Sequence, residues 1–169
     1  MTTSIEPLPP PTGLSPSAVE SFTSCPMAFR FANIERLDEP PTIHTARGSL
    51  VHRALELAYL APPAQRRPEH FAACTETAIA EYHQLPDVLR LGLDATALAT
   101  LDDECRTLVT RYQTMEDPTS IEPIGLEVWM RVDVGGLILR GIIDRLELRD
   151  GELLIYFTEH DALTFEPLD

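Results

Sequence analysis

The chain has 169 residues, 44 % of them hydrophobic, which is the size and composition of one ordinary globular domain. It carries 27 acidic residues against 13 basic ones, a formal net charge of −14. This balance excludes the overall basic character of a free-standing nucleic-acid-binding protein, whose basic face displaces counterions from phosphates. An acidic chain can still act on DNA if its acids hold metal ions, or if a fused or partner domain supplies the binding.

The N-terminal segment MTTSIEPLPPPTG has neither the basic start nor the apolar core of a signal peptide. Its prolines predict a disordered, Pro-rich tail over residues 1–13, followed by one domain over residues 14–169. The sequence contains no apolar run of about 18 residues, so no membrane-spanning helix is predicted. Three widely spaced cysteines, Cys25, Cys74 and Cys105, argue against a disulfide framework, so a cytoplasmic location is expected.

Helices are predicted first along the chain. LSPSAVESFTSCPMAFRF begins with Ser15 as an N-cap, and Ser17 with Glu20 offers a competing capping box. The apolar stripe of this segment, Val19, Phe22 and residues 26–29, is expected to face the core.

Three longer helices follow, separated from the first by the loop IERLDEPPT. They are predicted over TARGSLVHRALELAYL, over about residues 68–84 and over residues 94–115, the last with amphipathic three–four spacing. The apolar spacing of the first of these predicts one buried face, made of Leu50, Val51, Ala54, Leu55 and Ala58.

From Gly125 the apolar period changes to two. EVWMRVDV, LILRGIIDRLEL and ELLIYF predict three antiparallel strands, joined by tight turns at Gly135-Gly136 and Asp150-Gly151. The predicted fold class is therefore α+β, with N-terminal helices packed on an antiparallel three-stranded sheet.

The two turns also predict a register in which Glu127 faces Asp144 and Asp144 faces Phe157. Opposed like charges are unfavourable, by about 3 kcal/mol at ~5 Å and an effective dielectric of ~20. A hard divalent cation such as Mg²⁺ or Mn²⁺ would relieve this repulsion. The alternative is that Glu127 lies at a solvated strand end and that a bulge shifts the register.

His52 and Cys25 are the other candidates. A single helical histidine is more often structural than a ligand. A single cysteine is by default a buried thiol, and Cys74 and Cys105 lie in helical patterns typical of the core.

Four segments in order, LSPSAVESFTSCPMAFRF, RGSLVHRALE, LEVWM and LRGIIDRLEL, resemble the RecB-type branch of the PD-(D/E)XK nuclease superfamily. This branch includes nuclease domains of bacterial recombination helicase–nucleases and the related CRISPR adaptation nucleases. The resemblance spans about Leu14 to Ile155 and implies a restriction-endonuclease-like α/β core. It further implies a metal-dependent DNA exonuclease of repair and recombination, with DNA as substrate and a helicase or other repair protein as a candidate partner.

The resemblance also assigns roles to residues. His52 matches the histidine that contributes to the metal site, Asp144 the central metal-binding aspartate, and Glu127 an acid on the preceding strand. Cys25 matches the first cysteine of members that bind an iron–sulfur cluster, whose other three cysteines lie near the C-terminus. No cysteine follows Cys105, so an iron–sulfur cluster is not expected, and Mg²⁺ or Mn²⁺ is expected to bind weakly.

The last motif departs from the family. An acid and a lysine, typically in D-Y-K, are replaced by Phe157 and Glu159, and the chain stops ten residues after Glu159. The C-terminal part of the fold is therefore expected to be missing. Three hypotheses stay open: an active nuclease, a degenerate or truncated member without catalysis, and an acidic interaction module on the same scaffold. Glu159, His160 and Asp161 could supply an irregular third ligand, and a frameshift or artificial boundary would equally explain the last segment.

Overall fold

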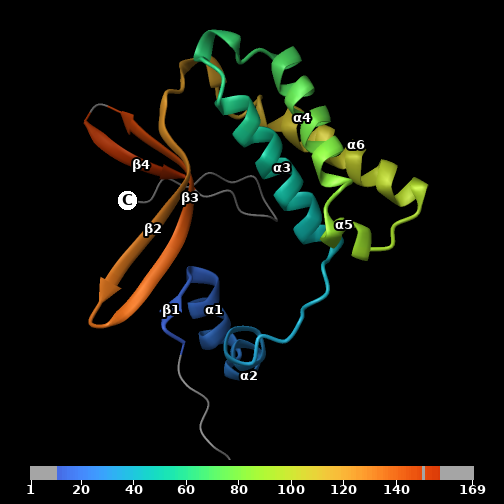
Figure 1. Cartoon of the computed structure of the whole chain (residues 1–169). Helices are drawn as coiled ribbons and strands as arrows, with labels where there is room; N and C mark the ends of the chain where they lie inside the picture. The colour runs from blue at the N-terminus through green and yellow to red at the C-terminus, as the bar shows by residue number, and fades with distance from the viewer. Residues whose placement is uncertain (1–10, 150, 157–169) are drawn as a thin grey trace, which may run out of the picture. The chain divides into compact units, whose positions relative to one another are not determined.

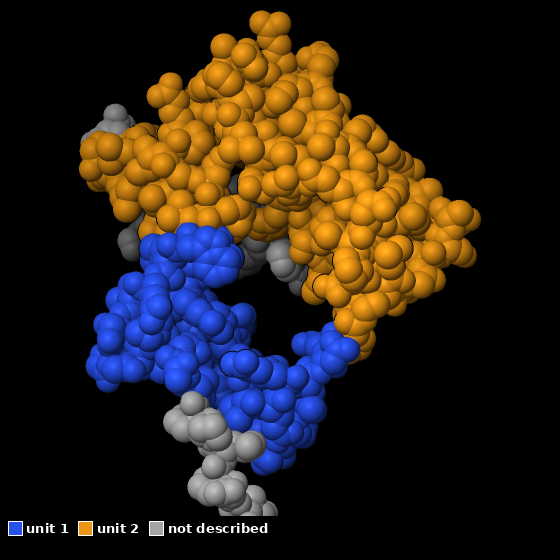
Figure 2. All heavy atoms as spheres, in the orientation of Figure 1, with its two compact units in different colours: residues 1–39, 129–142 blue, residues 40–128, 143–169 orange. Residues whose placement is uncertain are grey.

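Residues 11–149 and 151–156 are described by the computed structural model, and the chain divides into two units. Unit 1 consists of Met1–Glu39 and Trp129–Ile142, and unit 2 of Pro40–Val128 and Ile143–Asp169 (Figure 2). The predicted tail up to residue 10 lies outside the described residues. So do five residues on which predictions were made: Asp150, Phe157, Glu159, His160 and Asp161.

After the two-residue strand β1, the chain forms its helices and then its longer strands, as Figure 1 shows. The α-helices are α1 (Pro16–Ser24), α2 (Pro26–Phe29), α3 (Ile43–Tyr59), α4 (Pro68–Tyr82), α5 (Pro86–Arg90) and α6 (Ala95–Tyr112). A π-helical turn, η1 (Arg30–Ile34), follows α2, and 3₁₀ turns lie at η2 (Pro63–Gln65) and η3 (Pro118–Ser120). The strands are β1 (Gly13–Leu14), β2 (Pro123–Val134), β3 (Leu137–Arg149) and β4 (Glu152–Tyr156).

The core of unit 2 lies between α3, α4 and α6, which pack against one another (Figure 1). The predicted buried face of α3 is confirmed: Leu50, Val51, Ala54, Leu55 and Ala58 are all buried. Phe71 of α4 and Tyr112 of α6 complete the core with their rings. The three long helices begin and end within a few residues of the predicted positions, because their apolar spacing matches the helical period.

The N-terminal helix of unit 1 starts as predicted but buries less. Ser15 is the N-cap and its Oγ accepts a hydrogen bond of 3.2 Å from the amide of Ala18, so the competing cap at Ser17 is wrong. The apolar stripe is also wrong in part, because the side chains of Val19 and Phe22 are exposed. Apolar spacing establishes that a helix has one apolar face, but it cannot establish that another element covers that face.

The three predicted strands are confirmed, and the α+β fold class with them. Gly135 and Gly136 turn β2 into β3 with φ of 64° and 88°, values that residues with a side chain rarely adopt. β3 and β4 are antiparallel and pair Arg145 with Tyr156, the register that the second turn predicted. The sheet has a fourth strand that was not predicted, because β1 pairs over only two residues, in parallel with β3.

Among the described residues no helix combines the length and the apolar character needed to cross a membrane.

Candidate metal centre

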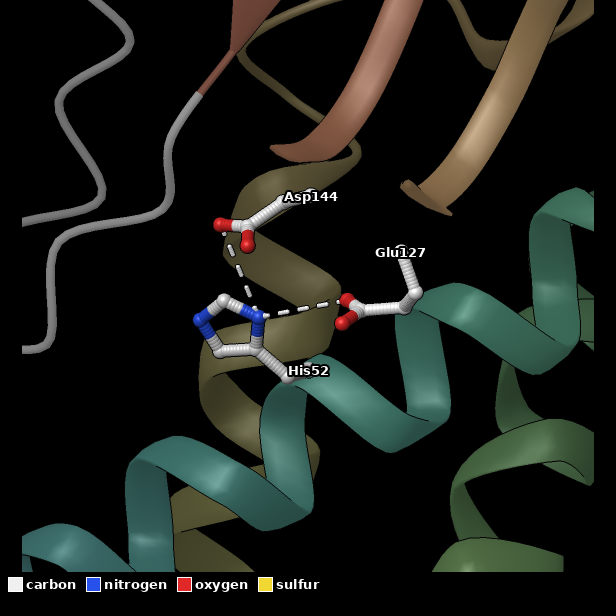
Figure 3. A group of neighbouring side chains, drawn as sticks. All are labelled: His52, Glu127 and Asp144. Carbon is white, nitrogen blue, oxygen red and sulfur yellow. Dashed lines mark ion pairs between the residues drawn. The ribbon is translucent and has the colours of Figure 1, made fainter. Parts of the chain in front are cut away.

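His52, Glu127 and Asp144 come together in unit 2 (Figure 3). Nδ1 of His52 lies 3.7 Å from Oδ2 of Asp144 and 3.9 Å from Oε1 of Glu127. One ligand atom from each of the three residues lies within 4.8 Å of the other two. Two hard carboxylate oxygens and one imidazole nitrogen therefore converge from a helix and two strands.

Helix α3 positions His52. Thr42 caps this helix, and Thr42 and Thr45 each accept a hydrogen bond of 3.2 Å from the other's backbone amide. His52 is half-buried beside the buried face of α3, with its ring directed toward the strands (Figure 3). Glu56 lies one turn further along and projects from the same side of the helix, because residues four apart share a face.

The backbone of Glu127 is unusual. Its φ is 48°, so a residue with a side chain occupies the left-handed region inside strand β2. This conformation is characteristic of bulged strands, costs on the order of 1–3 kcal/mol, and clusters at functional sites. Gly125 lies just before it, and a Cβ there would overlap Cγ2 of Val128. Glu127 is therefore not at a solvated strand end, but its strand is less regular than the predicted row assumed.

The two carboxylates affect each other. Burial raises the pKa of Glu127 above its usual range, and the negative charges of Asp144 and Glu56 raise it further. At 4.8 Å and an effective dielectric of ~20, two unit charges repel by about 3 kcal/mol. A protein retains such a cluster more readily when a cation compensates it. Glu56 is the acid that the sequence reasoning did not assign to the site, although its spacing from His52 in RGSLVHRALE was visible.

A small cavity adjoins the three side chains. Its volume is about 30 Å³, enough for one water molecule or ion. Its lining comes from α3, α6, β2 and β3: His52, Leu55, Glu56, Tyr59, Tyr112, Leu126, Glu127, Asp144 and Arg145.

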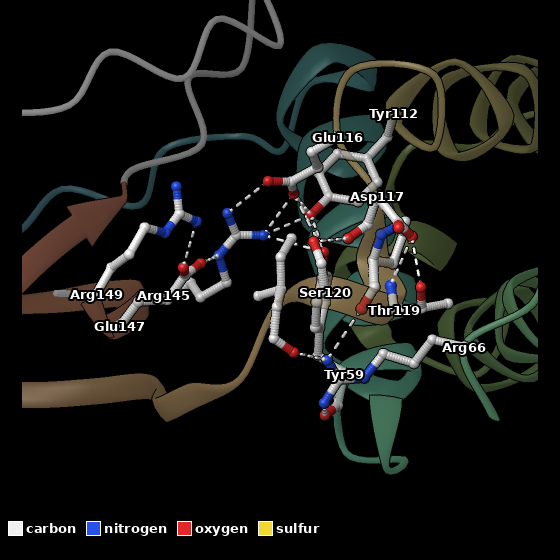
Figure 4. Close-up of polar contacts among 12 residues, drawn as sticks. Tyr59, Arg66, Tyr112, Glu116, Asp117, Thr119, Ser120, Arg145, Glu147 and Arg149 are labelled. Carbon is white, nitrogen blue, oxygen red and sulfur yellow. Dashed lines mark hydrogen bonds and ion pairs between the residues drawn. The ribbon is translucent and has the colours of Figure 1, made fainter. Parts of the chain in front are cut away.

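Arg145, the residue after Asp144, fixes β3 to the helices (Figure 4). Its guanidinium donates two hydrogen bonds to the Glu116 carboxylate, at 2.5 and 2.9 Å. Nη1 also donates to the hydroxyls of Tyr112 and Tyr59, at 2.7 and 3.1 Å. Tyr156 of β4 stacks on the guanidinium at 4.2 Å from its ring centroid. We call Arg145, Glu116, Tyr59, Tyr112 and Tyr156 the Arg145 clamp.

The clamp stays charged although it is buried. Burial alone would raise the pKa of Glu116, but the hydrogen bonds from Arg145 and Tyr112 outweigh it and hold the pKa below the usual range. Burial likewise lowers the pKa of Arg145, and the bonds to Glu116 outweigh it and raise the pKa. Burial also raises the pKa of Tyr59 and of Tyr112, so both hydroxyls stay protonated and able to donate.

Arg66 makes a second buried attachment, at the segment leading into β2 (Figure 4). Its guanidinium donates to the carbonyls of Ala61, Pro118, Ile121 and Tyr59, at 2.8, 3.2, 2.5 and 3.1 Å. These bonds hold the chain just before β2, the strand that carries Glu127.

None of the three cysteines is among the converging ligand residues, all of which are described. Cys25 is exposed, so the default expectation of a buried thiol is wrong, whereas Cys74 and Cys105 are buried as expected. Burial raises the pKa of the Cys105 thiol to about 12, which keeps it protonated and unsuited to bind iron. The absence of an iron–sulfur cluster stays a prediction.

A family model of the PD-(D/E)XK nuclease superfamily matches residues 13–156, most of the chain. The chain belongs to this superfamily. No curated protein and no solved structure matches it. His52, Glu127 and Asp144 all lie within the matched residues. The superfamily is named for a motif that ends in lysine, yet the full sequence contains none, since all 13 basic residues are arginines.

We expect the Arg145 clamp to make a contribution to the free energy of unfolding that is lost in acid. Because the pKa of Glu116 is depressed in the folded state, its contribution is present above the unfolded pKa of about 4.3 and is lost as the pH falls through the folded value. Glu116→Gln removes one of two carboxylates that lie beside buried Arg145 in the described part of the chain and leaves Glu147, whose Oε1 lies 2.8 Å from Nε, so it should cost up to about 3 kcal/mol at pH 7. Urea unfolding followed by circular dichroism should show that loss, and a weaker acid dependence in the variant.

Glu104→Gln is the matched control. Glu104 pairs with Arg47 at 3.2 Å on the surface, where its side chain is 45 % exposed, so its loss should cost about 1 kcal/mol or less. Equal, small effects of both variants would show that the clamp does not hold the sheet to the helices.

Proposed function

We propose that this chain is a RecB-type member of the superfamily whose metal centre is formed by His52, Glu127 and Asp144, and whose substrate is DNA. The observation that carries the proposal is the convergence of three ligand atoms within 4.8 Å inside the matched region. Nucleases of this superfamily generally use Mg²⁺ or Mn²⁺. A role in repair and recombination is part of the proposal and rests on the four ordered segments shared with the RecB branch.

The residues present suit a hard divalent cation. Carboxylate oxygens are the ligands that Mg²⁺ and Mn²⁺ prefer, and imidazole is accepted by Mn²⁺. The cation would offset the repulsion between Glu127 and Asp144 and would polarise a phosphate and lower the pKa of an attacking water. Asp144 and Glu127 would bind through their oxygens, and His52 would bind through Nδ1 or orient the carboxylates from there.

Hydrolysis is proposed to be impaired. The hairpin arithmetic of the sequence, whose register the pair Arg145 and Tyr156 follows, predicts Asp144 opposite position 157, where the family has its second acid and this sequence has Phe157. Position 159, where the family has lysine, is Glu159. Both positions lie outside the described residues, and no lysine elsewhere in the sequence can replace the missing one.

A second candidate is a catalytically inactive, acidic interaction module on the same scaffold. It is favoured by the missing lysine and by the charge of unit 2, which has 21 acidic residues against nine arginines, a net −12. Such a surface would bind a basic protein partner in preference to free DNA.

Metal binding tests the centre directly. Isothermal titration with Mn²⁺ should show weak binding at one site, because three protein ligands leave the ion short of a complete first shell. Asp144→Asn removes an anionic ligand with little change in shape and should abolish the heat of binding. Asp87→Asn, at an acid 77 % exposed on α5, should bind as the unchanged chain does. Undiminished binding by Asp144→Asn would show that the ion binds elsewhere.

Cleavage tests the chemistry. The unchanged chain should cleave linear DNA little or not at all, since losing a general acid or base alone costs about 10²–10⁴ in rate. The double variant Phe157→Asp with Glu159→Lys restores the family pattern and should gain Mg²⁺-dependent cleavage. Adding Asp144→Ala should abolish that gain. Efficient cleavage by the unchanged chain, lost in Asp144→Ala, would show instead that Glu159 or His160 completes the site.

A further inference from the structure

A groove in unit 1 is lined by three arginines. Its volume is about 590 Å³. Arg36 follows the π-helical turn η1, and Arg131 and Arg140 lie on β2 and β3. The remaining lining is mostly small or neutral: Pro11, Thr12, Gly13, Ala32, Asn33 and Ile138. We call this feature the arginine groove.

The three guanidinium groups have no protein partners among residues 11–149 and 151–156. Most other arginines in that part of the chain are engaged, for example Arg30 with Glu35 at 2.6 Å and Arg106 with Glu76 at 2.6 Å. Two nearby acids already have partners. Glu35 pairs with Arg30, and Asp133 accepts a hydrogen bond of 2.8 Å from the amide of Gly136. The groove is therefore lined by cations that make no direct ion pair with the described residues.

Hairpin geometry sets two of these cations opposite each other. β2 ends at Val134 and β3 begins at Leu137, so a regular two-residue hairpin pairs residues equally distant from the turn, and Arg131 then faces Arg140. Like charges directly opposed across a hairpin are unfavourable. An anion placed between the two guanidinium groups would turn this repulsion into attraction.

Charge is divided unevenly between the units. Unit 1 contains six acidic residues and four arginines, a net −2, whereas unit 2 has a net charge of −12. The strongly acidic composition that argues against DNA binding by the whole chain is thus a property of unit 2. Three of the four arginines in unit 1 line this one groove.

We propose that the arginine groove binds the sugar–phosphate backbone of DNA. Planar guanidinium groups match phosphate oxygens with two parallel hydrogen bonds, and exposed arginines lose little hydration when they do so. Contacts of this kind bind without reading sequence and weaken with salt, because each one releases counterions. This inference rests on the proposed function in taking DNA as the substrate, but it assigns the binding to residues other than those of the metal centre.

The experiment measures binding without cleavage. Fluorescence anisotropy of a labelled single-stranded oligonucleotide is recorded with the full chain in EDTA across a salt series. The slope of log affinity against log salt should be smaller by about 2 in Arg36→Ala/Arg131→Ala/Arg140→Ala, at about 0.7 for each phosphate that is no longer neutralised. The corresponding triple lysine variant keeps the charges and should retain most of the slope. Arg67→Ala/Arg111→Ala removes exposed arginines outside the groove and should leave the slope unchanged.

The outcomes separate the two proposals. An unchanged slope in the triple alanine variant, or no DNA binding by the unchanged chain, would overturn the groove inference. Mn²⁺ binding that depends on Asp144 would still support the metal centre in that case. Competition by millimolar inorganic phosphate as effective as competition by DNA would also overturn it, since it would mark a site for free phosphate. Loss of Mn²⁺ binding with DNA binding retained would instead count against the metal centre alone.

Discussion

A buried pair of charges, Arg145 with Glu116, is the contact on which the metal centre depends. Arg145 is 4 % exposed and joins β3 to the end of α6 through Glu116 and Tyr112, and to α3 through Tyr59. Asp144 precedes Arg145 on β3, and His52 lies two helical turns before Tyr59 on α3. The clamp therefore fixes the two elements whose side chains must meet.

Burying such charges has a cost that hydrogen bonds and opposite charges must offset. Here both oxygens of Glu116 accept from Arg145, and both tyrosine hydroxyls contribute to the network. A second buried carboxylate, that of Glu147, lies 2.8 Å from Nε of Arg145. Replacement of such pairs by apolar residues often gives equal stability, so the role that we expect of this pair is to fix the register of strand and helix. The same reasoning applies to Arg66, whose four carbonyl acceptors orient the segment before β2.

Local patterns in the sequence predict much of this fold. The spacing of Leu50 to Ala58 predicts α3 and its buried face, and the two glycine turns predict the strands and the register of β3 with β4. Other features depend on tertiary partners that no local pattern reveals. Arg145 and Arg66 are charged and yet buried, because they bind acceptors that include residues distant in the sequence, Glu116 for Arg145 and Pro118 for Arg66.

The left-handed backbone of Glu127 was equally hidden, since nothing in LEVWM distinguishes a residue with positive φ from a regular strand residue. The resemblance predicted that His52 joins the two acids, and hairpin arithmetic predicted that Glu127 faces Asp144. Neither predicted that Glu56 lies beside them. The apolar face of α1 is partly exposed. Apolar spacing therefore identifies the face that a helix can bury, but it does not predict whether another element covers that face.

Acidic residues and arginines are distributed unequally between the two units of the chain. Unit 2 concentrates acids, a few of which converge on the candidate metal centre, whereas unit 1 is nearly neutral and gathers three of its arginines in one groove. A metal ion in unit 2 and phosphates in unit 1 would each relieve repulsion that the protein has built in. The sequence has no lysine and has phenylalanine at position 157, and the hydrolysis that we propose to be impaired for this reason is separate from this arrangement of charges.

Crystals of the chain grown with Mn²⁺ and measured at a wavelength where manganese scatters anomalously would show whether His52, Glu127 and Asp144 bind a metal ion. We expect one anomalous peak within about 2.5 Å of carboxylate oxygens of both Glu127 and Asp144, beside the imidazole of His52. A well-ordered crystal with those side chains visible and no peak between them, or with the peak at other residues, would contradict it.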